Sequence, residues 1–231
     1  MVLIDLSHPL DADIPMFPGL PAPEIAVLLS REESRAHYAG DTTFVIHRYA
    51  FAGNSGTYLD TPYHRHSSGA DTASLPLSAT ADLPGLVIDV HARVEQGERG
   101  FGAELFEGLE LAGVAVLLYT GWDRRWGASD YLGPNPFLTG DAGQTLVERG
   151  AALVGIDSWN IDDTSDGRRP VHTCVLGAGI PIVENLRGLA QLPARDFRFT
   201  AVPLPFRGGS AVPVRAFASV GSERSASQRQ T

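Results

Sequence analysis

Glycine and proline interrupt this chain so often that its regular elements must be short. The sequence holds 25 Gly and 16 Pro in 231 residues, and short apolar or alternating stretches lie between them. Stretches of this length favour strands over helices. We predict seven strands, at residues 2–6, 43–51, 86–90, 114–119, 152–156, 199–204 and 212–217.

Fewer segments have a helical pattern. Residues 103–111 and 141–148 fit helices, the second with Thr139 or Asp141 as its N-cap, and a short third helix is expected to begin near Glu184. Strands that outnumber helices, with helices between some of them, indicate an α/β layer with a mixed sheet. The pattern leaves the strand order open.

The length of the chain fits one compact domain, and neither a repeat nor a long linker divides it. We predict a single domain over residues 1–218. Residues 219–231 have almost no apolar side chains and are expected to form a disordered tail.

Composition excludes several classes of function. A net charge of −9 argues against a nucleic-acid or anionic membrane partner, and no run of 18 apolar residues predicts a membrane span. The single cysteine, Cys174, excludes a disulfide framework and a multi-cysteine zinc site. All 18 basic residues are arginine, which excludes a lysine Schiff base. We therefore expect a cytoplasmic enzyme with a small-molecule substrate.

Reactive side chains gather in three places, two of them directly after predicted strands. They are residues 54–66, residues 155–163, and His172 together with Glu184. Loops at strand ends are where α/β enzymes place catalytic groups. Any one of these side chains is also typical of a turn, a cap or a structural hydrogen bond. If the three clusters converge, they supply the histidine and carboxylate groups that metal ions and acid–base steps use.

Residues 54–64 read NSGTYLDTPYH. This segment resembles the signature His-x-Gly-Thr-His-x-Asp-x-Pro-x-His of the Putative cyclase family, which includes bacterial kynurenine formamidase, isatin hydrolase and polyketide cyclases. Five positions agree in register. Further matching segments run from about residue 3 to 218: DLSHP at 5–9, FPG at 17–19, TGW at 120–122, GID at 155–157, ENL at 184–186 and PVRA at 213–216.

The resemblance implies a swivelling β/β/α domain that assembles as a homo-dimer or homo-tetramer. Pockets in such proteins often lie near subunit contacts. Phe17 and Trp122 are therefore expected to touch a flat substrate.

The resemblance also implies a catalytic and metal-binding set. The family's hydrolases hold one divalent metal with the first two signature histidines and the aspartate, and here Asn54 and Tyr58 replace those histidines. An amide and a neutral phenol are poor zinc ligands. A second metal position in the family maps onto Asp60, His172 and Glu184, and the catalytic histidine maps onto His64.

Three hypotheses follow. We favour metal-free acid–base catalysis without a cofactor, in which His64 moves a proton during ring closure, dehydration or isomerisation of a small carbonyl compound, plausibly in natural-product biosynthesis. In that scheme Asp60 or Glu184 orients His64, and Tyr58 and Asn54 donate to a developing oxyanion. The first alternative is an amide or lactone hydrolase with one zinc or manganese ion on Asp60, His172 and Glu184. The second is a non-catalytic binding relative.

Overall fold

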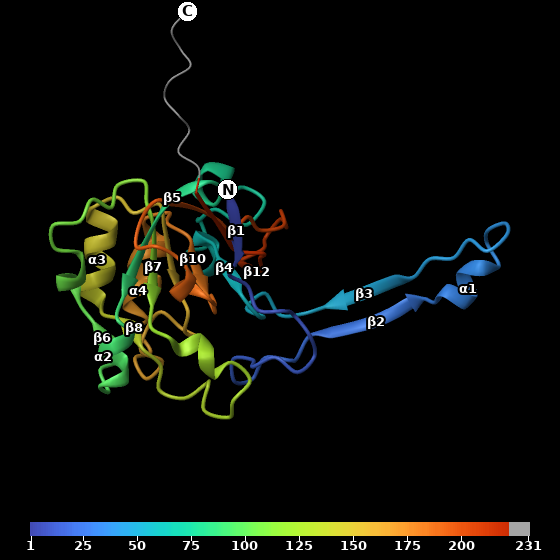
Figure 1. The fold of residues 1–231 in the computed structure, drawn as a ribbon, viewed down its shortest axis with the longest axis horizontal. Coiled ribbons are helices and arrows are strands. Elements are labelled where there is room, and N and C mark those ends of the chain that lie inside the picture. Colours follow the sequence, from blue (N-terminus) through green and yellow to red (C-terminus); the bar gives the residue numbers. More distant parts are fainter. Residues whose placement is uncertain (222–231) are drawn as a thin grey trace, which may run out of the picture.

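The computed structural model describes residues 1–221, which form a body built on a nine-stranded mixed sheet (Figure 1). The strand order is β1-β13-β11-β5-β7-β9-β10-β4-β12, where β5, β7, β9 and β10 run parallel and every other neighbouring pair is antiparallel. The strands are β1 (Val2–Asp5), β4 (Tyr58–Asp60), β5 (Leu83–Asp89), β7 (Ala115–Tyr119), β9 (Leu153–Ile156), β10 (Ile182–Glu184), β11 (Phe197–Thr200), β12 (Ala211–Pro213) and β13 (Phe217–Val220).

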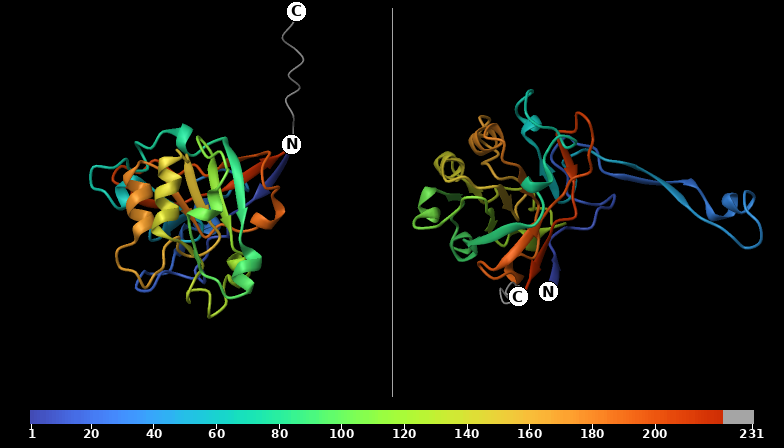
Figure 2. Two further views of the ribbon diagram at one scale, coloured as in Figure 1. Left: turned by 90° about the vertical axis from the view of Figure 1, so that its left-hand side faces the viewer. Right: turned by 90° about the horizontal axis from the view of Figure 1, so that it is seen from above.

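The parallel strands are apolar on both faces, and each face contributes to a different core. On β7, Val116 and Leu118 pack under the helices, whereas Ala115 and Leu117 face the second core. This alternation follows from the two-residue period of a strand. Helices α3 (Gly140–Glu148) and α4 (Pro170–Gly177) cover the first face (Figure 2). The antiparallel strands β11 and β13 curl round to cover part of the second face, so the central strands are buried on both sides.

A long hairpin projects from the body, and we call residues 24–50 the arm (Figures 1 and 2). It consists of β2 (Glu24–Leu29), α1 (Arg31–Arg35) and β3 (Ile46–Ala50). In the described residues β2 and β3 pair only with each other. A capping box at Ser30 and Glu33 begins α1.

The remaining elements are short. They are α2 (His91–Glu95), the paired strands β6 (Gly100–Phe101) and β8 (Phe137–Leu138), and the 3-10 turns η1 (Pro62–His64), η2 (Leu77–Ala79), η3 (Ala103–Phe106), η4 (Trp122–Arg125) and η5 (Leu189–Gln191). Among residues 1–221, every helix is too short or too polar to cross a bilayer.

The α/β class with a mixed sheet is confirmed, as are six of the seven predicted strands to within a few residues. The strand predicted at residues 212–217 is wrong, because the segment is divided between β12 and β13. The helix predicted at 103–111 is wrong after Phe106, where the 3-10 turn η3 ends. Gly108 adopts a positive φ of 68°, which a helix does not allow. Helix α3 is confirmed, with Thr139 at its N-cap position.

Two other expectations need correction. Glu184 does not begin a helix; it ends β10 and is followed by Asn185 with φ 56°. Ser219 and Val220, which the sequence places in the tail, pair with β1 as part of β13. Residues 222–231 of the expected tail lie outside the described residues.

Candidate active site

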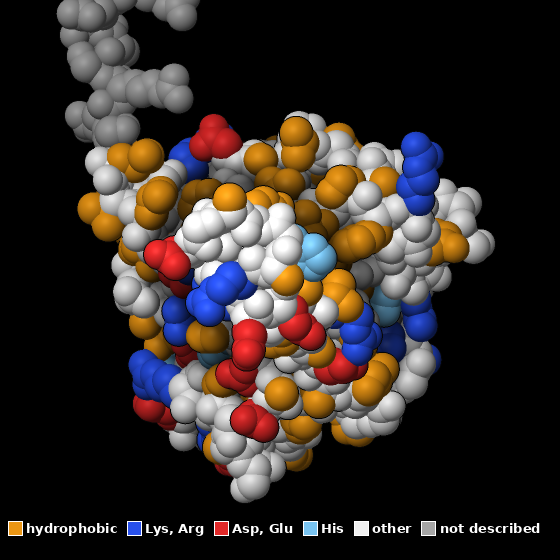
Figure 3. Space-filling model, turned by 90° about the vertical axis from the view of Figure 1, so that its right-hand side faces the viewer, with side chains coloured by type: hydrophobic (Ala, Val, Ile, Leu, Met, Phe, Trp, Pro, Cys, Tyr) orange, Lys and Arg blue, Asp and Glu red, His pale blue; other side chains and the backbone are white. Residues whose placement is uncertain are grey.

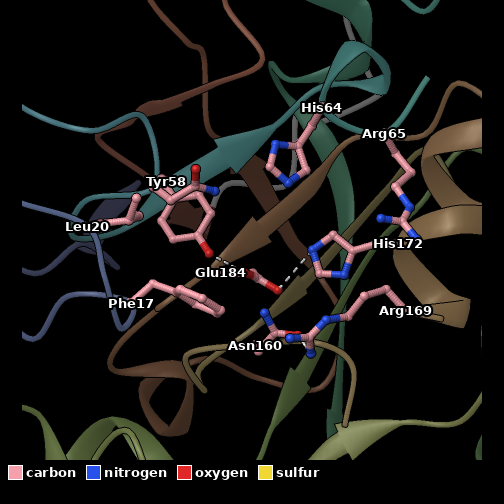
Figure 4. A pocket seen from close by; sticks show the side chains of 10 residues that line it. Phe17, Leu20, Tyr58, His64, Arg65, Asn160, Arg169, His172 and Glu184 are labelled. Atoms are coloured by element: carbon pink, nitrogen blue, oxygen red, sulfur yellow. Dashed lines mark hydrogen bonds and ion pairs between the residues drawn. The ribbon is translucent and has the colours of Figure 1, made fainter. Parts of the chain in front are cut away.

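A cavity of about 230 Å³ opens beside β4, β10 and the start of α4 (Figure 4). Ten side chains line it: Phe17, Leu20, Asn54, Tyr58, His64, Arg65, Asn160, Arg169, His172 and Glu184. They come from segments far apart in the sequence, and they include residues of all three clusters that the sequence singles out. The clusters do converge.

Two buried carboxylates, Glu184 in the cavity wall and Asp60 behind it, come from two adjacent antiparallel strands. Tyr58 of β4 is directly opposite Glu184 of β10, and Asp60 follows two residues later on the same face. The Tyr58 hydroxyl donates a hydrogen bond to Oε2 of Glu184, and the amide of Ile161 donates to Oε1 at 2.7 Å. Asp60 and Glu184 are fully buried.

His172 reaches the same point from the first turn of α4. Its Nδ1 lies 2.6 Å from Oδ2 of Asp162, and the same carboxylate accepts from the backbone amides of Val171 and His172 at 2.8 and 3.0 Å. Asp162 therefore caps α4 and fixes the imidazole ring at once. Nδ1 is occupied by Asp162, so Nε2 faces the carboxylates of the cavity.

Two carboxylate oxygens and one imidazole nitrogen lie close together at this point. Nε2 of His172 lies 3.6 Å from Oδ2 of Asp60 and 3.5 Å from Oε1 of Glu184, and the three atoms all lie within 4.8 Å of one another. These separations are too long for strong hydrogen bonds. Oδ2 of Asp60 is buried without a hydrogen-bond partner in the described residues.

This donor set fits a divalent cation such as zinc or manganese. Two carboxylates and an imidazole are ligands that these metals accept, and a carboxylate on the other ring nitrogen is a common support for a metal-binding histidine. A cation between Asp60, His172 and Glu184 also satisfies the orphaned oxygen of Asp60.

The protonation of the cluster reflects its burial and its negative charge. Burial disfavours a charged imidazole, but Glu184, Asp162 and Asp60 outweigh this effect and raise the pKa of His172. Burial raises the pKa of Glu184 as well, His172 opposes this rise, and Asp60 adds to it. Burial, with the charges of Glu184 and Asp60, holds the pKa of Tyr58 well above its usual value, so the phenol stays protonated.

Asn54 and Tyr58 stand in place of two signature histidines. Each of them donates a hydrogen bond to a carboxylate. Nδ2 of Asn54 donates to Oδ1 of Asp60 at 3.0 Å, and Tyr58 donates to Glu184. Each of these hydrogen bonds binds one oxygen of a carboxylate, and the other oxygen of the same carboxylate faces His172. Both also line the cavity.

His64 lies at the cavity wall on η1, where Pro62 at the first position helps to set the turn. Its Nδ1 is 3.6 Å from Oδ1 of Asp60, and its ring centroid is 6.1 Å from that of His172. The side chain is 33% exposed, so it can reach both solvent and a bound molecule.

The structure brings one of the two expected aromatics to the cavity. Phe17 lines it and lies 5.7 Å, between ring centroids, from Trp159. Trp122 is instead buried in an aromatic cluster with Tyr131 and Trp159, and its indole nitrogen donates to the carbonyl of Tyr131 at 2.9 Å. It is not among the residues that line the cavity.

Four residues here have roles that the sequence does not predict. Asp162 and Asn160 belong to the second cluster, but a carboxylate after a strand looks the same whether it supports a histidine or a turn. Arg65 follows His64 directly, and Arg169 precedes Pro170 in a loop. The nearby Asp157 lies outside the cavity wall, because it binds the amides of Thr120 and Gly121.

Comparisons with known proteins find relatives that match nearly the whole chain. A family model described as Putative cyclase matches residues 4–163. Kynurenine formamidase from Bacillus cereus (strain ZK / E33L) is 30% identical over 213 residues, which cover 92% of this chain and 95% of that protein. Isatin hydrolase A from Ralstonia solanacearum superposes with a TM-score of 0.82 at 25% identity, covering 95% of this chain and 92% of the other. Isatin hydrolase A from Labrenzia aggregata, bound to benzyl benzoate, gives a TM-score of 0.83 at 24% identity over 95% and 93% of the two chains.

Proposed function

This chain is an enzyme that belongs to the Putative cyclase family, and we propose that it hydrolyses an amide or lactone bond of a small carbonyl compound, with one divalent cation held by Asp60, His172 and Glu184. The observation that carries the proposal is the convergence of those three buried side chains around the unpartnered oxygen of Asp60. The relatives named kynurenine formamidase and isatin hydrolase are hydrolases by name, which supports hydrolysis over ring closure.

The protein groups have separate tasks in this reaction. When bound, the cation supplies Lewis-acid polarisation and lowers the pKa of a coordinated water. His64 accepts the proton that water loses as its oxygen attacks the carbonyl carbon, and returns it to the leaving nitrogen or oxygen when that bond to carbon breaks. Water is thus added across one bond, and no other reactant is consumed.

Asn54 and Tyr58 act through the carboxylates in this scheme. Their hydrogen bonds occupy one oxygen each of Asp60 and Glu184, which leaves the other oxygen directed toward His172. They are therefore positioning residues. Asp162 has the same kind of task for His172.

A second candidate is the metal-free reaction that the sequence favours: ring closure, dehydration or isomerisation in a biosynthetic pathway. One observation supports it, namely that Tyr58 and Asn54, which both carry a hydrogen-bond donor, line the cavity. Against it, Asn54 and Tyr58 each donate to a carboxylate of the protein, and an oxyanion donor would instead point to the substrate oxygen.

The test compares metal binding with activity. Protein stripped with a chelator is titrated with zinc or manganese by calorimetry and assayed on aryl formamides, cyclic amides and lactones. We expect one ion per chain and recovery of hydrolysis in the same titration. Glu184→Gln should lose both, whereas Glu104→Gln, at an exposed site outside the cavity, should lose neither. Hydrolysis that is indifferent to chelation would contradict the assignment.

We further propose that the arm binds a second copy of the chain. An isolated two-stranded hairpin is marginal in water, yet this one exposes Ile25, Val27, Leu28, Ile46 and Tyr49. Figure 3, which views the molecule from the arm's side, shows hydrophobic side chains scattered among charged ones. The arm also joins the body at the cavity: Phe17 and Leu20 precede it, and Asn54 follows it.

A further inference from the structure

Two arginines line the cavity on the side of His172. Arg65 follows η1, and Arg169 is the residue before α4 (Figure 4). Phe17 and Leu20 lie on the other side of the view. The cavity therefore has a cationic wall, an apolar wall, and the acid–base cluster between them.

Neither guanidinium forms an ion pair with a carboxylate of residues 1–221. Arg65 donates to Thr173 Oγ1 at 3.1 Å and to the carbonyl of Arg168 at 3.0 Å, and Arg169 donates to the carbonyl of Asp163 at 3.2 Å. Within residues 1–221, no carboxylate oxygen lies within 4.0 Å of either one. The adjacent Arg168 is different, because it forms an ion pair with Asp166 at 2.8 Å.

The backbone of Arg169 is also unusual. Its φ and ψ of 49° and 62° lie in the left-handed region, which is uncommon for a residue with a long side chain. Such a conformation costs on the order of 1 kcal/mol and persists where the surroundings impose it, often at binding sites. Here it places a half-buried guanidinium beside Asn160 at the cavity wall.

The opposite wall suits a flat apolar group. Phe17 is supported by Trp159, and Leu20 extends the surface. A cavity of about 150 Å³ can hold benzene. The 230 Å³ measured here therefore accommodates a ring together with a small polar substituent.

We propose that Arg65 and Arg169 bind a carboxylate of the substrate, which is then an aromatic carbonyl compound carrying one negative charge. The planar fork of a guanidinium matches a carboxylate. The pair is stronger where it is partly desolvated, as at the half-buried Arg169, whereas Arg65 is exposed. The carbonyl part of this assignment rests on the proposed function; the carboxylate part rests on the two arginines.

Binding of simple probes tests the carboxylate part without turnover. Benzoate, benzamide and benzyl alcohol are titrated into the purified protein at low salt and followed by calorimetry. We expect benzoate to bind at least about tenfold more tightly than either neutral probe, since hydrogen bonds to charged groups contribute that much. Arg65→Gln and Arg169→Gln should each remove most of this preference.

Controls separate charge recognition from folding and from binding elsewhere. Arg65→Lys and Arg169→Lys keep the charge and should retain part of the preference, and Arg195→Gln, exposed outside the cavity, should retain all of it. Equal binding of benzoate and benzamide would overturn the proposal. So would a preference for benzoate that survives in the Arg65→Gln/Arg169→Gln double variant, because the carboxylate would then be bound by another group.

The two proposals fail separately. Benzoate selectivity that depends on the arginines, in a protein without hydrolytic activity, would refute the hydrolase assignment and leave the anion site intact. Hydrolysis of neutral and anionic aryl formamides with equal kcat/KM would refute the anion site and leave the hydrolase assignment intact.

Discussion

Asp162 accepts hydrogen bonds from both the side chain and the backbone amide of His172, at 2.6 and 3.0 Å. One carboxylate therefore sets the position of the helix that carries His172 and the rotation of its ring. A histidine fixed in this way presents Nε2 in one direction before any ligand arrives.

Removing the charge of Asp162 should weaken metal binding. For Asp162→Asn we expect zinc or manganese affinity to fall roughly 10- to 100-fold, as is usual when the partner of a metal-binding histidine is changed. Titration calorimetry on chelator-treated protein gives the affinity. Asp163→Asn is the matched control, since that neighbouring carboxylate bonds to Ser165 and should leave the affinity unchanged. Equal affinities of Asp162→Asn and wild type would contradict a supporting role for Asp162.

Loss of His64 should abolish most of the activity and little of the stability. We expect His64→Ala to lower kcat about 100-fold or more, the usual contribution of a general base. Because the side chain is 33% exposed, the melting temperature should change little. His66→Ala is the control: its ring bonds to the carbonyl of Thr173 outside the cavity wall, so kcat should persist. A fully active His64→Ala enzyme would remove His64 from the mechanism.

Tyr58→Phe distinguishes the two candidate reactions. It deletes the hydroxyl that donates to Glu184 and keeps the ring. In the hydrolase the loss in kcat should stay below about tenfold, because one supporting hydrogen bond is removed. A loss of 100-fold or more would instead match a donor to a developing oxyanion and favour the metal-free reaction.

His8 should make the protein less stable in mild acid. Its ring stacks on Trp126 at 3.8 Å, and burial together with the charge of Arg187 lowers its pKa from 6.5 to about 4. Between these pH values the unfolded chain binds a proton that the folded chain does not, so stability falls as pH falls. Allowing for partial exposure of the ring, the loss amounts to about 2 kcal/mol.

His8→Phe keeps an aromatic ring at this position without titrating. Urea unfolding at pH 7.5 and pH 4.5 should therefore show a smaller loss of stability for the variant than for wild type. Identical losses in the two proteins would mean that His8 does not contribute.

Charges on the arm should prevent association. Ile25 and Val27 lie on one face of β2, and both are exposed. We expect Ile25→Glu with Val27→Glu to shift the sedimentation coefficient from an oligomer to a single chain, with the far-UV spectrum unchanged. Leu77→Glu alters an apolar residue of the body that is even more exposed, and it should leave the oligomer intact. A wild type that sediments as one chain at all concentrations would refute the assembly.

The longer strands could be predicted from the sequence because buried parallel strands are continuous apolar runs. Strands β4 and β10 have only three residues each, too few for any period to appear. The sequence does not predict helix α4, because most of its residues are apolar and a short apolar run does not distinguish a buried helix from a strand.

The site was predictable only in part. The grouping of Asp60, His172 and Glu184 came from the family resemblance, since no local pattern relates residues 112 and 124 positions apart. The anion-binding arginines carry no sequence signal: Arg169 depends on a backbone conformation that its own side chain disfavours. Trp122 is the opposite case: the sequence predicts contact with the substrate, and the structure packs this side chain against other aromatic residues.

The pairing of Tyr58 with Glu184 across β4 and β10 has a consequence for folding. A slip of one residue between these strands would turn one member of the pair to the opposite face, and the acids would no longer meet. Residues more than 100 positions apart must be aligned before the cluster exists, so it forms only once the long-range sheet is complete. Binding of a cation at this point would therefore report correct strand registry, and a chain with shifted strands would be inert as well as misfolded.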